Sequence, residues 1–339
     1  MFVTTRDKGN ACAILGTCKL RNHCVIRATT SNFVSVKHFR SVKPLASGAR
    51  VALLAPAGPL QKPEELPRAQ DNARAFGWEP IVTPHATDRI GYLAGRDRDR
   101  LDDINHALRD PKIDALWILR GGYGMIRILP GIDYEALSRA PKPIIGYSDV
   151  TALHAAVQRK CRLITYHGPT ARETMTDFSR DSFLRAVVQQ TDSCGVAPNA
   201  REISHGHAEG RLVGGNLAVL ASLCGTPFAP DISDGILVLE DINEPVYRID
   251  RMFQQLMLSG ALNGCRAIVF GECVKCPDDA GGGGRPFDEV IGEIAEELGV
   301  PCMAGIPLGH IHEQWTIPIG ATATLDTNAR KLTVTSYES

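Results

Sequence analysis

Residues 142–159 read KPIIGYSDVTALHAAVQR, and this stretch decides the predicted fold. The apolar run at 142–146 favours a buried strand, and residues 149–159 favour a helix that begins directly after it. A strand followed at once by a helix is part of a βαβ unit, from which parallel sheets are built. The stretch therefore predicts an α/β fold, with Ser148 at the turn between a strand and a helix.

The same alternation precedes this stretch in the sequence. Apolar runs that favour strands alternate with segments of helical periodicity, the strands at 50–59, 79–84 and 115–119 and the helices at 63–76, 96–108 and 134–139. Such alternation predicts a parallel sheet, and ligands bind these sheets beyond the carboxyl ends of the strands. We expect a Rossmann-like or flavodoxin-like N-terminal domain over residues 49–172.

The second half of the chain has a different pattern. A helix and then a polar, irregular stretch predict a connecting helix and linker over residues 173–207. Beyond it, strands and helices alternate less regularly, and three late apolar runs between 315 and 335 favour closing antiparallel strands. We expect a mixed α+β C-terminal domain over residues 208–337.

Composition and charge set limits on the function. The chain has 339 residues, 44% of them hydrophobic, which is typical of a globular protein long enough for two domains. Residues 1–50 carry nine Lys/Arg and one acid, whereas the remainder carries 28 basic and 37 acidic residues. An acidic body is a poor nucleic-acid binder, and no apolar run reaches the length of about 18 residues that spans a membrane. We expect residues 1–48 to be a disordered basic extension rather than a targeting segment, because their apolar run at 11–15 is too short for a signal-peptide core.

The ten cysteines are scattered, which predicts reduced and mostly buried thiols. Cys273 and Cys276 have CxxC spacing, but no second pair follows to complete a zinc site. A redox CxxC opens a helix after a strand, whereas a proline and a run of glycines follow here. We expect neither a metal site nor a redox site.

Ser148 is the first candidate for catalysis. A Ser at a sharp strand-to-helix turn is exposed at the sheet edge, and the backbone N–H groups after it have no partner within the helix. Those donors, aided by the helix dipole, can stabilise an oxyanion, as in the nucleophile elbow of hydrolases. The motif reads G-Y-S-D rather than G-x-S-x-G, and taken alone it is explained better by an N-cap at Ser148 or Asp149.

The segment RGGYG at 120–124 follows the predicted strand at 115–119, so it should lie on the same sheet edge as Ser148. Paired glycines let a backbone approach a substrate closely. The segment lacks the Lys-Ser/Thr of a P-loop and the spacing of a dinucleotide fingerprint. It is compatible with a second oxyanion donor and with a plain turn.

An acid and a histidine in the second half are candidates for a relay to Ser148. Glu240 ends the apolar run at 236–239, and a buried carboxylate needs a partner, although Asp241 and Glu244 could take its role. His310 follows an apolar segment, with His312 as its close competitor. By residue type alone, each of the three acids is explained better as an exposed loop residue, and no histidine stands out as a general base. His154 lies on the predicted helix at 149–159 and is explained better by packing.

Five segments together resemble, in order and spacing, the motifs of the LD-carboxypeptidase family of serine peptidases. They are RGGYG at 120–124, GYSD at 146–149, GGNL at 214–217, LEDINE at 239–244 and GH at 309–310. The resemblance runs from about residue 50 to about residue 335. It implies an α/β N-terminal domain that carries the Ser, a C-terminal domain that carries Glu and His, and an active site between them.

The resemblance also implies residue roles. The family's nucleophile falls on Ser148, its relay Glu on Glu240 and its relay His on His310. The oxyanion donors fall on the backbone N–H of Asp149 and of one glycine of the 121–122 pair, of which we favour Gly122. We further expect substrate contacts from Arg120, Gly121, Tyr123 and Asn216, with Arg120 suited to the substrate's terminal carboxylate.

Typical members of the family remove the terminal D-Ala from muropeptide tetrapeptides by cutting an L,D peptide bond during cell-wall recycling. The resemblance therefore implies a small peptide substrate, no cofactor, a cytoplasmic location and, as in many members, a homodimer. A related branch cleaves peptidyl-nucleotide antibiotics and confers immunity, and this alternative stays open. An alternative of another class is a non-catalytic α/β ligand-binding protein, which an intact Ser–Glu–His set disfavours.

Overall fold

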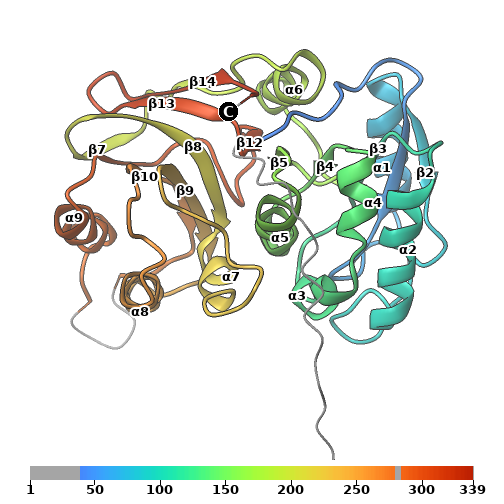
Figure 1. Cartoon of the computed structure of the whole chain (residues 1–339), viewed down its shortest axis with the longest axis horizontal. Coiled ribbons are helices and arrows are strands. Elements are labelled where there is room, and N and C mark those ends of the chain that lie inside the picture. The colour runs from blue at the N-terminus through green and yellow to red at the C-terminus, as the bar shows by residue number, and fades with distance from the viewer. Residues whose placement is uncertain (1–38, 279–283, 339) are drawn as a thin grey trace, which may run out of the picture. The chain divides into compact units, whose positions relative to one another are not determined.

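The computed structural model describes residues 39–278 and 284–338, and two sheets carry its fold (Figure 1). The first sheet has six strands in the order β12-β5-β4-β3-β1-β2. Its strands are β1 (Arg50–Leu54), β2 (Glu79–Val82), β3 (Ala115–Ile118), β4 (Ile144–Ile145), β5 (Thr165–His167) and β12 (Ile317–Ile319). All neighbouring pairs are parallel except β12 with β5.

The helices around the first sheet follow its strands in sequence, as the alternation predicts. They are α1 (Glu65–Ala75), α2 (Asp97–Arg109), α3 (Met125–Ile128), α4 (Tyr134–Arg139) and α5 (Thr151–Cys161). Every residue of β3 is buried, as in a parallel strand covered on both faces. Nearly all of α5 is buried too, which fits its run of alanines and apolar residues. The expected α/β fold is confirmed, and the parallel strands end on one common edge.

The second sheet has eight strands in the order β6-β14-β13-β8-β9-β10-β11-β7. Its strands are β6 (Gly195–Val196), β7 (Arg201–Ser204), β8 (His207–Asn216), β9 (Gly235–Ile242), β10 (Ala267–Val274), β11 (Cys302–Ala304), β13 (Thr322–Asp326) and β14 (Lys331–Ser336). The four strands from β8 to β11 are parallel, and the outer ones are antiparallel. The remaining helices are α6 (Asp177–Leu184), continued by a π turn at Arg185–Gln189, α7 (Leu217–Ser222), α8 (Val246–Leu258) and α9 (Phe287–Leu298).

Three segments differ from the sequence predictions. The run at 315–319, expected to close the second domain, supplies β12 to the first sheet. The expected linker supplies β6 and β7 to the second sheet. Residues 39–48, expected to be disordered, pack against the body of the protein through the buried side chains of Phe39, Val42 and Leu45. The rest of the predicted extension, residues 1–38, lies outside the described residues.

The cysteines also differ in part from expectation. Cys273 and Cys276 form a disulfide at the end of β10, so the prediction of reduced thiols is wrong for this pair. The free cysteines among the described residues are mostly buried, as predicted. No helix within residues 39–278 and 284–338 is long and apolar enough to cross a membrane.

Candidate active site

Ser148 lies where β4 turns into the helical segment that leads to α5. Its φ angle is +64°, in the left-handed region that residues other than glycine rarely adopt. A 3₁₀ turn, Ser148–Val150, continues directly into α5. Ser148 is partly exposed, whereas its neighbours Tyr147 and Asp149 are buried. A non-glycine residue held in this conformation at a strand-to-helix turn indicates a functional constraint.

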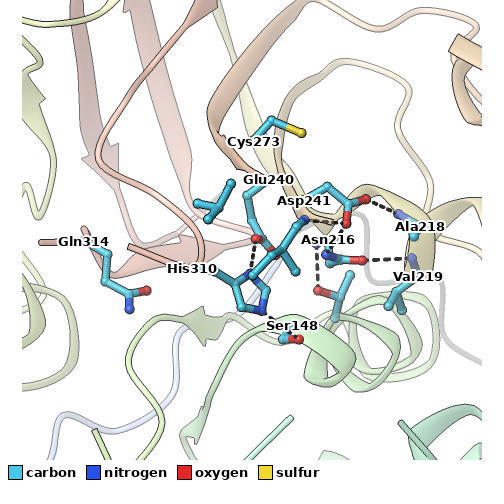
Figure 2. Close-up of polar contacts among 12 residues, drawn as sticks. Ser148, Asn216, Ala218, Val219, Glu240, Asp241, Cys273, His310 and Gln314 are labelled. Atoms are coloured by element: carbon cyan, nitrogen blue, oxygen red, sulfur yellow. Dashed lines mark hydrogen bonds and ion pairs between the residues drawn. The ribbon is translucent and has the colours of Figure 1, made fainter. Parts of the chain in front are cut away.

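Ser148, His310 and Glu240 form one chain of hydrogen bonds (Figure 2). Nε2 of His310 lies 3.2 Å from Oγ of Ser148, and Nδ1 of His310 lies 2.8 Å from Oε2 of Glu240. His310 is 162 residues from Ser148 and 70 residues from Glu240 in the sequence, so the fold alone brings the three together. The arrangement lets the imidazole take a proton from the hydroxyl while the carboxylate holds the other ring nitrogen.

Glu240 lies inside β9, and its side chain is fully buried. Its second oxygen, Oε1, has no hydrogen-bond partner among the described residues. Gly309 packs against the carboxylate with a φ of +109°, and a Cβ at this position would lie 2.9 Å from Oε2 of Glu240. Because an isolated buried carboxylate is costly, the bond to His310 is the interaction that compensates for the burial of Glu240.

The surroundings of His310 raise its pKa. Burial is the largest single influence and acts in the opposite direction because it disfavours the imidazolium, but the hydrogen bond and charge of Glu240 and the neighbouring carboxylates together outweigh it. The carboxylates of Glu173 and Asp241 add to the effect of Glu240. The site therefore stabilises a proton on His310, which a general base needs while it holds the proton it has accepted.

The loop that carries His310 is hydrogen-bonded to the end of β10. The N–H of Gly305 donates to the carbonyl of Phe270 at 2.9 Å, and the N–H of Glu272 donates to the carbonyl of Leu308 at 3.1 Å. Gly271 lies so close that a Cβ there would be 2.4 Å from the carbonyl oxygen of Leu308. The register of β10 with β9 shifts at this point, and such irregularities are used to redirect chains near active sites.

The glycine-rich loop at 120–124 lies against Ser148. A Cβ on Gly121 would lie 2.8 Å from Cβ and 3.1 Å from Oγ of Ser148, so only glycine fits there. Gly122 has a φ of +96° and is exposed, whereas Gly121 is buried. Gly121 is thus the glycine of the pair that contacts Ser148, and the N–H groups of both glycines remain candidates for an oxyanion donor.

Two buried charged side chains hold the far end of this loop. Oδ2 of Asp149 accepts a hydrogen bond from the N–H of Met125 at 2.8 Å, and burial raises the pKa of Asp149 to about 6. Nη1 of Arg100 donates to the carbonyl of Gly124 at 3.0 Å. The residue that follows Ser148 therefore also anchors the loop that faces Ser148.

The rival acids have other partners. Asp241 accepts hydrogen bonds from the N–H of Ala218 at 2.9 Å and from the amide of Asn216 at 3.1 Å, so it caps the start of α7 (Figure 2). Burial raises the pKa of Asp241 to about 6. Glu244 forms an ion pair with Arg248, four residues further along. Of the three acids, Glu240 alone hydrogen-bonds to His310.

The rival histidines lie elsewhere. The side chain of His312 is exposed, and only the backbone carbonyl of this residue has a described partner, the hydroxyl of Ser179 at 3.4 Å. His154 is fully buried on α5, with Nε2 2.8 Å from the carbonyl oxygen of Gly146, and burial lowers its pKa to about 4. His154 therefore packs and braces the turn before Ser148, as expected.

The residues expected to contact the substrate differ in burial and in their hydrogen-bond partners. Oδ1 of Asn216 accepts from the N–H of Val219 at 3.1 Å and its amide nitrogen donates to Asp241, and the side chain is buried. Tyr123 is exposed, with its ring 5.6 Å from that of Tyr92. Arg120 is partly buried beside the glycine pair. Asn216 thus caps the start of α7, and substrate contacts from Asn216 and from the 120–124 loop stay predictions.

Two side chains near His310 were not singled out in the sequence. The ring of Tyr147 lies 4.9 Å from that of His310, and its hydroxyl hydrogen-bonds to Glu173. Burial raises the pKa of both Tyr147 and Glu173. Adjacency to Ser148 could have marked Tyr147, but Glu173 follows β5 in a stretch without any recognised pattern. Among the described residues no three His, Cys, Asp or Glu are grouped to hold a metal ion.

Comparison with known proteins identifies the family. The model of the LD-carboxypeptidase N-terminal domain matches residues 51–168, and the model of the C-terminal domain matches residues 209–325. The murein tetrapeptide carboxypeptidase of Pseudomonas aeruginosa is 35% identical, over 82% of this chain and 94% of its own length. The chain belongs to the LD-carboxypeptidase family.

Solved structures agree with this assignment. The muramoyltetrapeptide carboxypeptidase of Oxalobacter formigenes is 31% identical, with a TM-score of 0.74 over 84% of this chain and 97% of its own. The microcin C7 self-immunity protein MccF, in complex with aspartyl sulfamoyl adenosine, is 25% identical, with a TM-score of 0.79 over 87% of this chain and 98% of its own. This LD-carboxypeptidase is thus a serine-type hydrolase of peptide bonds, as the motifs predict.

Proposed function

We propose that this LD-carboxypeptidase releases the terminal D-Ala from muropeptide tetrapeptides by hydrolysing the L,D peptide bond, as a step of cell-wall recycling in the cytoplasm. The substrate is inferred from relatives named for murein and muramoyl tetrapeptides. The chemistry rests on one observation, the hydrogen-bond chain from Ser148 through His310 to Glu240.

In the proposed acylation step, Oγ of Ser148 attacks the carbonyl carbon of the L-centred residue. Nε2 of His310 accepts the hydroxyl proton, and Glu240 stabilises the imidazolium that forms. The protonated imidazole then gives this proton to the amine of D-Ala as the C–N bond breaks. The raised pKa of His310 supports this role, because it makes uptake of the proton easier.

The negative charge on the carbonyl oxygen needs donors at the moment of attack. The N–H of Asp149 at the start of the 3₁₀ turn and one N–H of the Gly121–Gly122 pair are our candidates, the first aided by the free donors of a helical N-terminus. Each such donor is worth about 10²–10³ in rate. Water then attacks the ester on Ser148 with His310 as base, which restores the hydroxyl and releases the tripeptide.

The direct test is to incubate the purified enzyme with a muropeptide tetrapeptide and to measure free D-Ala. We expect release by the wild type and a loss of about 10⁴-fold or more in Ser148→Ala. Ser222→Ala, at an exposed position on α7, is the matched control and should keep full activity. Equal release by Ser148→Ala would refute the catalytic role of Ser148, and no release by the wild type would refute the substrate.

A peptidyl-nucleotide antibiotic is the second candidate substrate. Two observations favour it: the structural similarity to MccF with a bound sulfamoyl adenosine, and the exposed ring of Tyr123 on the loop that contacts Ser148. Aromatic rings stack on nucleobases. A panel that offers a muropeptide tetrapeptide and an aspartyl-nucleotide conjugate to the same enzyme separates the two, since the higher kcat/KM identifies the better substrate.

A further inference from the structure

Three arginine side chains gather beside the glycine-rich loop, and the carboxylate of Glu65 lies among them. Arg120 interacts electrostatically with Arg172, Arg89 and Glu65. Nη1 of Arg172 pairs with Oε1 of Glu65 at 2.5 Å. Arg89 and Arg120 donate to backbone carbonyls instead, and within the described part of the chain Arg120 has no acidic hydrogen-bond partner. The cluster therefore carries more positive than negative charge.

Arg120 extends from the end of β3 over the backbone next to Ser148. A Cβ on Gly58 would lie 2.6 Å from Nη1 of Arg120, and a Cβ on Gly122 would lie 3.1 Å from it. The N–H of Gly58 donates to the carbonyl of Gly121, the residue that contacts Ser148. The guanidinium thus rests on the backbone of Gly58 and Gly122, where larger residues would leave it no room.

Arg172 approaches the same region from the loop after β5. Its charge acts on Tyr147 and Glu173, and the ring of Tyr147 is 4.9 Å from that of His310. Nε of Arg172 is buried and has no hydrogen-bond partner in the described structure. Glu65, itself only 4% exposed, keeps the guanidinium in place through one oxygen. Arg172 is therefore a cation held in place by Glu65, and its Nε–H has no acceptor among the described residues.

Partly buried like charges with too few counter-ions favour the binding of an anion. A carboxypeptidase substrate brings one such anion, because its leaving residue ends in a free carboxylate, one residue beyond the bond that is cut. We propose that Arg120 and Arg172 together bind the C-terminal carboxylate of the peptide substrate. This inference rests on the proposed function. It explains why the enzyme would cut only at a chain end: a longer peptide has no carboxylate at that place.

Glu65 has a distinct part in this arrangement. Its second oxygen, Oε2, accepts the N–H of Gln61 at 2.6 Å and that of Lys62 at 3.3 Å, so its charge is held by the start of α1 as well as by Arg172. The carboxylate of Glu65 therefore positions Arg172 without occupying Arg120. Guanidinium groups suit this task because they bind carboxylates through paired N–H donors.

The test compares two substrates and three variants. The substrates are a tetrapeptide with a free C-terminal D-Ala and the same peptide with that carboxylate converted to an amide. The variants are Arg120→Gln, a double variant and a control. The double variant, Glu65→Gln with Arg172→Gln, removes both charges of the buried pair, so the pair stays neutral. The control is Arg74→Gln, at an exposed α1 residue paired with Asp71. We expect the wild type to prefer the acid, and both site variants to lose about 10- to 100-fold in kcat/KM on the acid alone.

The outcomes separate this inference from its alternatives. An equal loss on acid and amide, or no loss at all, overturns the carboxylate site. A second carboxylate could come from the side chain of the third residue, so tetrapeptides whose third residue carries a side-chain carboxylate or lacks one are run in parallel. If the variants change the ratio of rates between these two peptides and leave the acid-to-amide ratio unchanged, the C-terminal assignment is wrong.

A further measurement keeps the two proposals distinct. If the wild type releases D-Ala from none of these peptides, the proposed function fails, and calorimetric titration with acetyl-D-Ala and with its amide still tests the site. Binding of the acid by the wild type and by Arg74→Gln, with its loss in Arg120→Gln, supports the carboxylate site. Equal binding of acid and amide, or equal binding by all variants, overturns it.

Discussion

Oγ of Thr151 accepts a hydrogen bond from the backbone N–H of Asn216 at 2.9 Å. Thr151 opens α5, directly after the turn that holds Ser148, and Asn216 ends β8, where it is paired in register with Glu240. Gly215 makes the approach possible, because a Cβ there would lie 2.4 Å from Oγ of Thr151. One buried hydrogen bond thus joins the helix after Ser148 to the strand pair that carries Glu240.

Thr151→Val should weaken this connection without changing the size of the side chain. The N–H of Asn216 would be left buried without a partner, at a cost of about 1–3 kcal/mol in the free energy of unfolding. We also expect kcat to fall, since Ser148 and Glu240 lose a shared anchor. Denaturant unfolding and steady-state kinetics measure the two effects. Thr165→Val is the control, because Oγ of Thr165 is buried without a described partner and its loss should cost nothing.

Gly121→Ala should impair catalysis while the protein stays folded. The added methyl would lie 2.8 Å from Cβ of Ser148 and would displace either the hydroxyl or the loop. We expect kcat to drop by about 10²-fold, comparable to the loss of one oxyanion donor. Gly292→Ala, in α9, has no atom nearer than 3.5 Å to the new methyl and serves as the control. Full activity in Gly121→Ala would show that the close contact is not needed.

The pH profile of kcat/KM should report the pair of His310 and Glu240. His310 must be neutral to accept the proton, so activity should rise with pH through a pKa above the usual histidine value of about 6.5. Glu240→Gln removes the charge that raises this pKa, so the acid limb should move to lower pH while kcat falls by about 10⁴-fold. Glu244→Gln should change neither quantity. An acid limb that stays in place in Glu240→Gln contradicts the assignment.

Asp149→Asn should alter the pH dependence of stability. The pKa of Asp149 is about 6 in the folded protein, above its ordinary value of about 3.9, so the folded state holds this proton more tightly than the unfolded state. The wild type therefore loses stability from this group as pH rises from about 4 to about 6, by up to about 3 kcal/mol. The variant lacks this loss, so its stability relative to the wild type should improve with rising pH. A pH-independent difference in unfolding free energy would contradict the burial of the carboxylate.

Much of the first sheet could be predicted from the sequence because its information is local. Each strand is a short apolar run, each helix follows within a few residues, and the turn at Ser148 joins one such pair. The set of Ser148, His310 and Glu240 came instead from the order of the motifs. Residues that lie 162 and 70 positions apart share no local signal that could pair them.

Other features could not be predicted, for physical reasons. The side chain of Asn216 hydrogen-bonds to Val219 and Asp241, and a sequence does not reveal which polar groups face inward. Gly121 and Gly122 differ in their contacts with Ser148, which depend on the direction of the loop rather than on residue type. The strand at 317–319 is a short apolar run, and nothing in its three residues specifies which sheet it joins.

The return of the chain to the first sheet has a consequence for how the polypeptide tolerates cleavage. Ile319 pairs with Thr165 of β5, and the next residue, Gly320, donates its N–H to the carbonyl of Leu212 in β8. A nick in the connecting stretch between β5 and β8 would thus give two fragments, and the later one would hold β12, the strand that covers β5 of the earlier one. Such fragments should stay together after proteolysis, and neither should fold well when made alone, because β5 would then be an uncovered border open to aggregation.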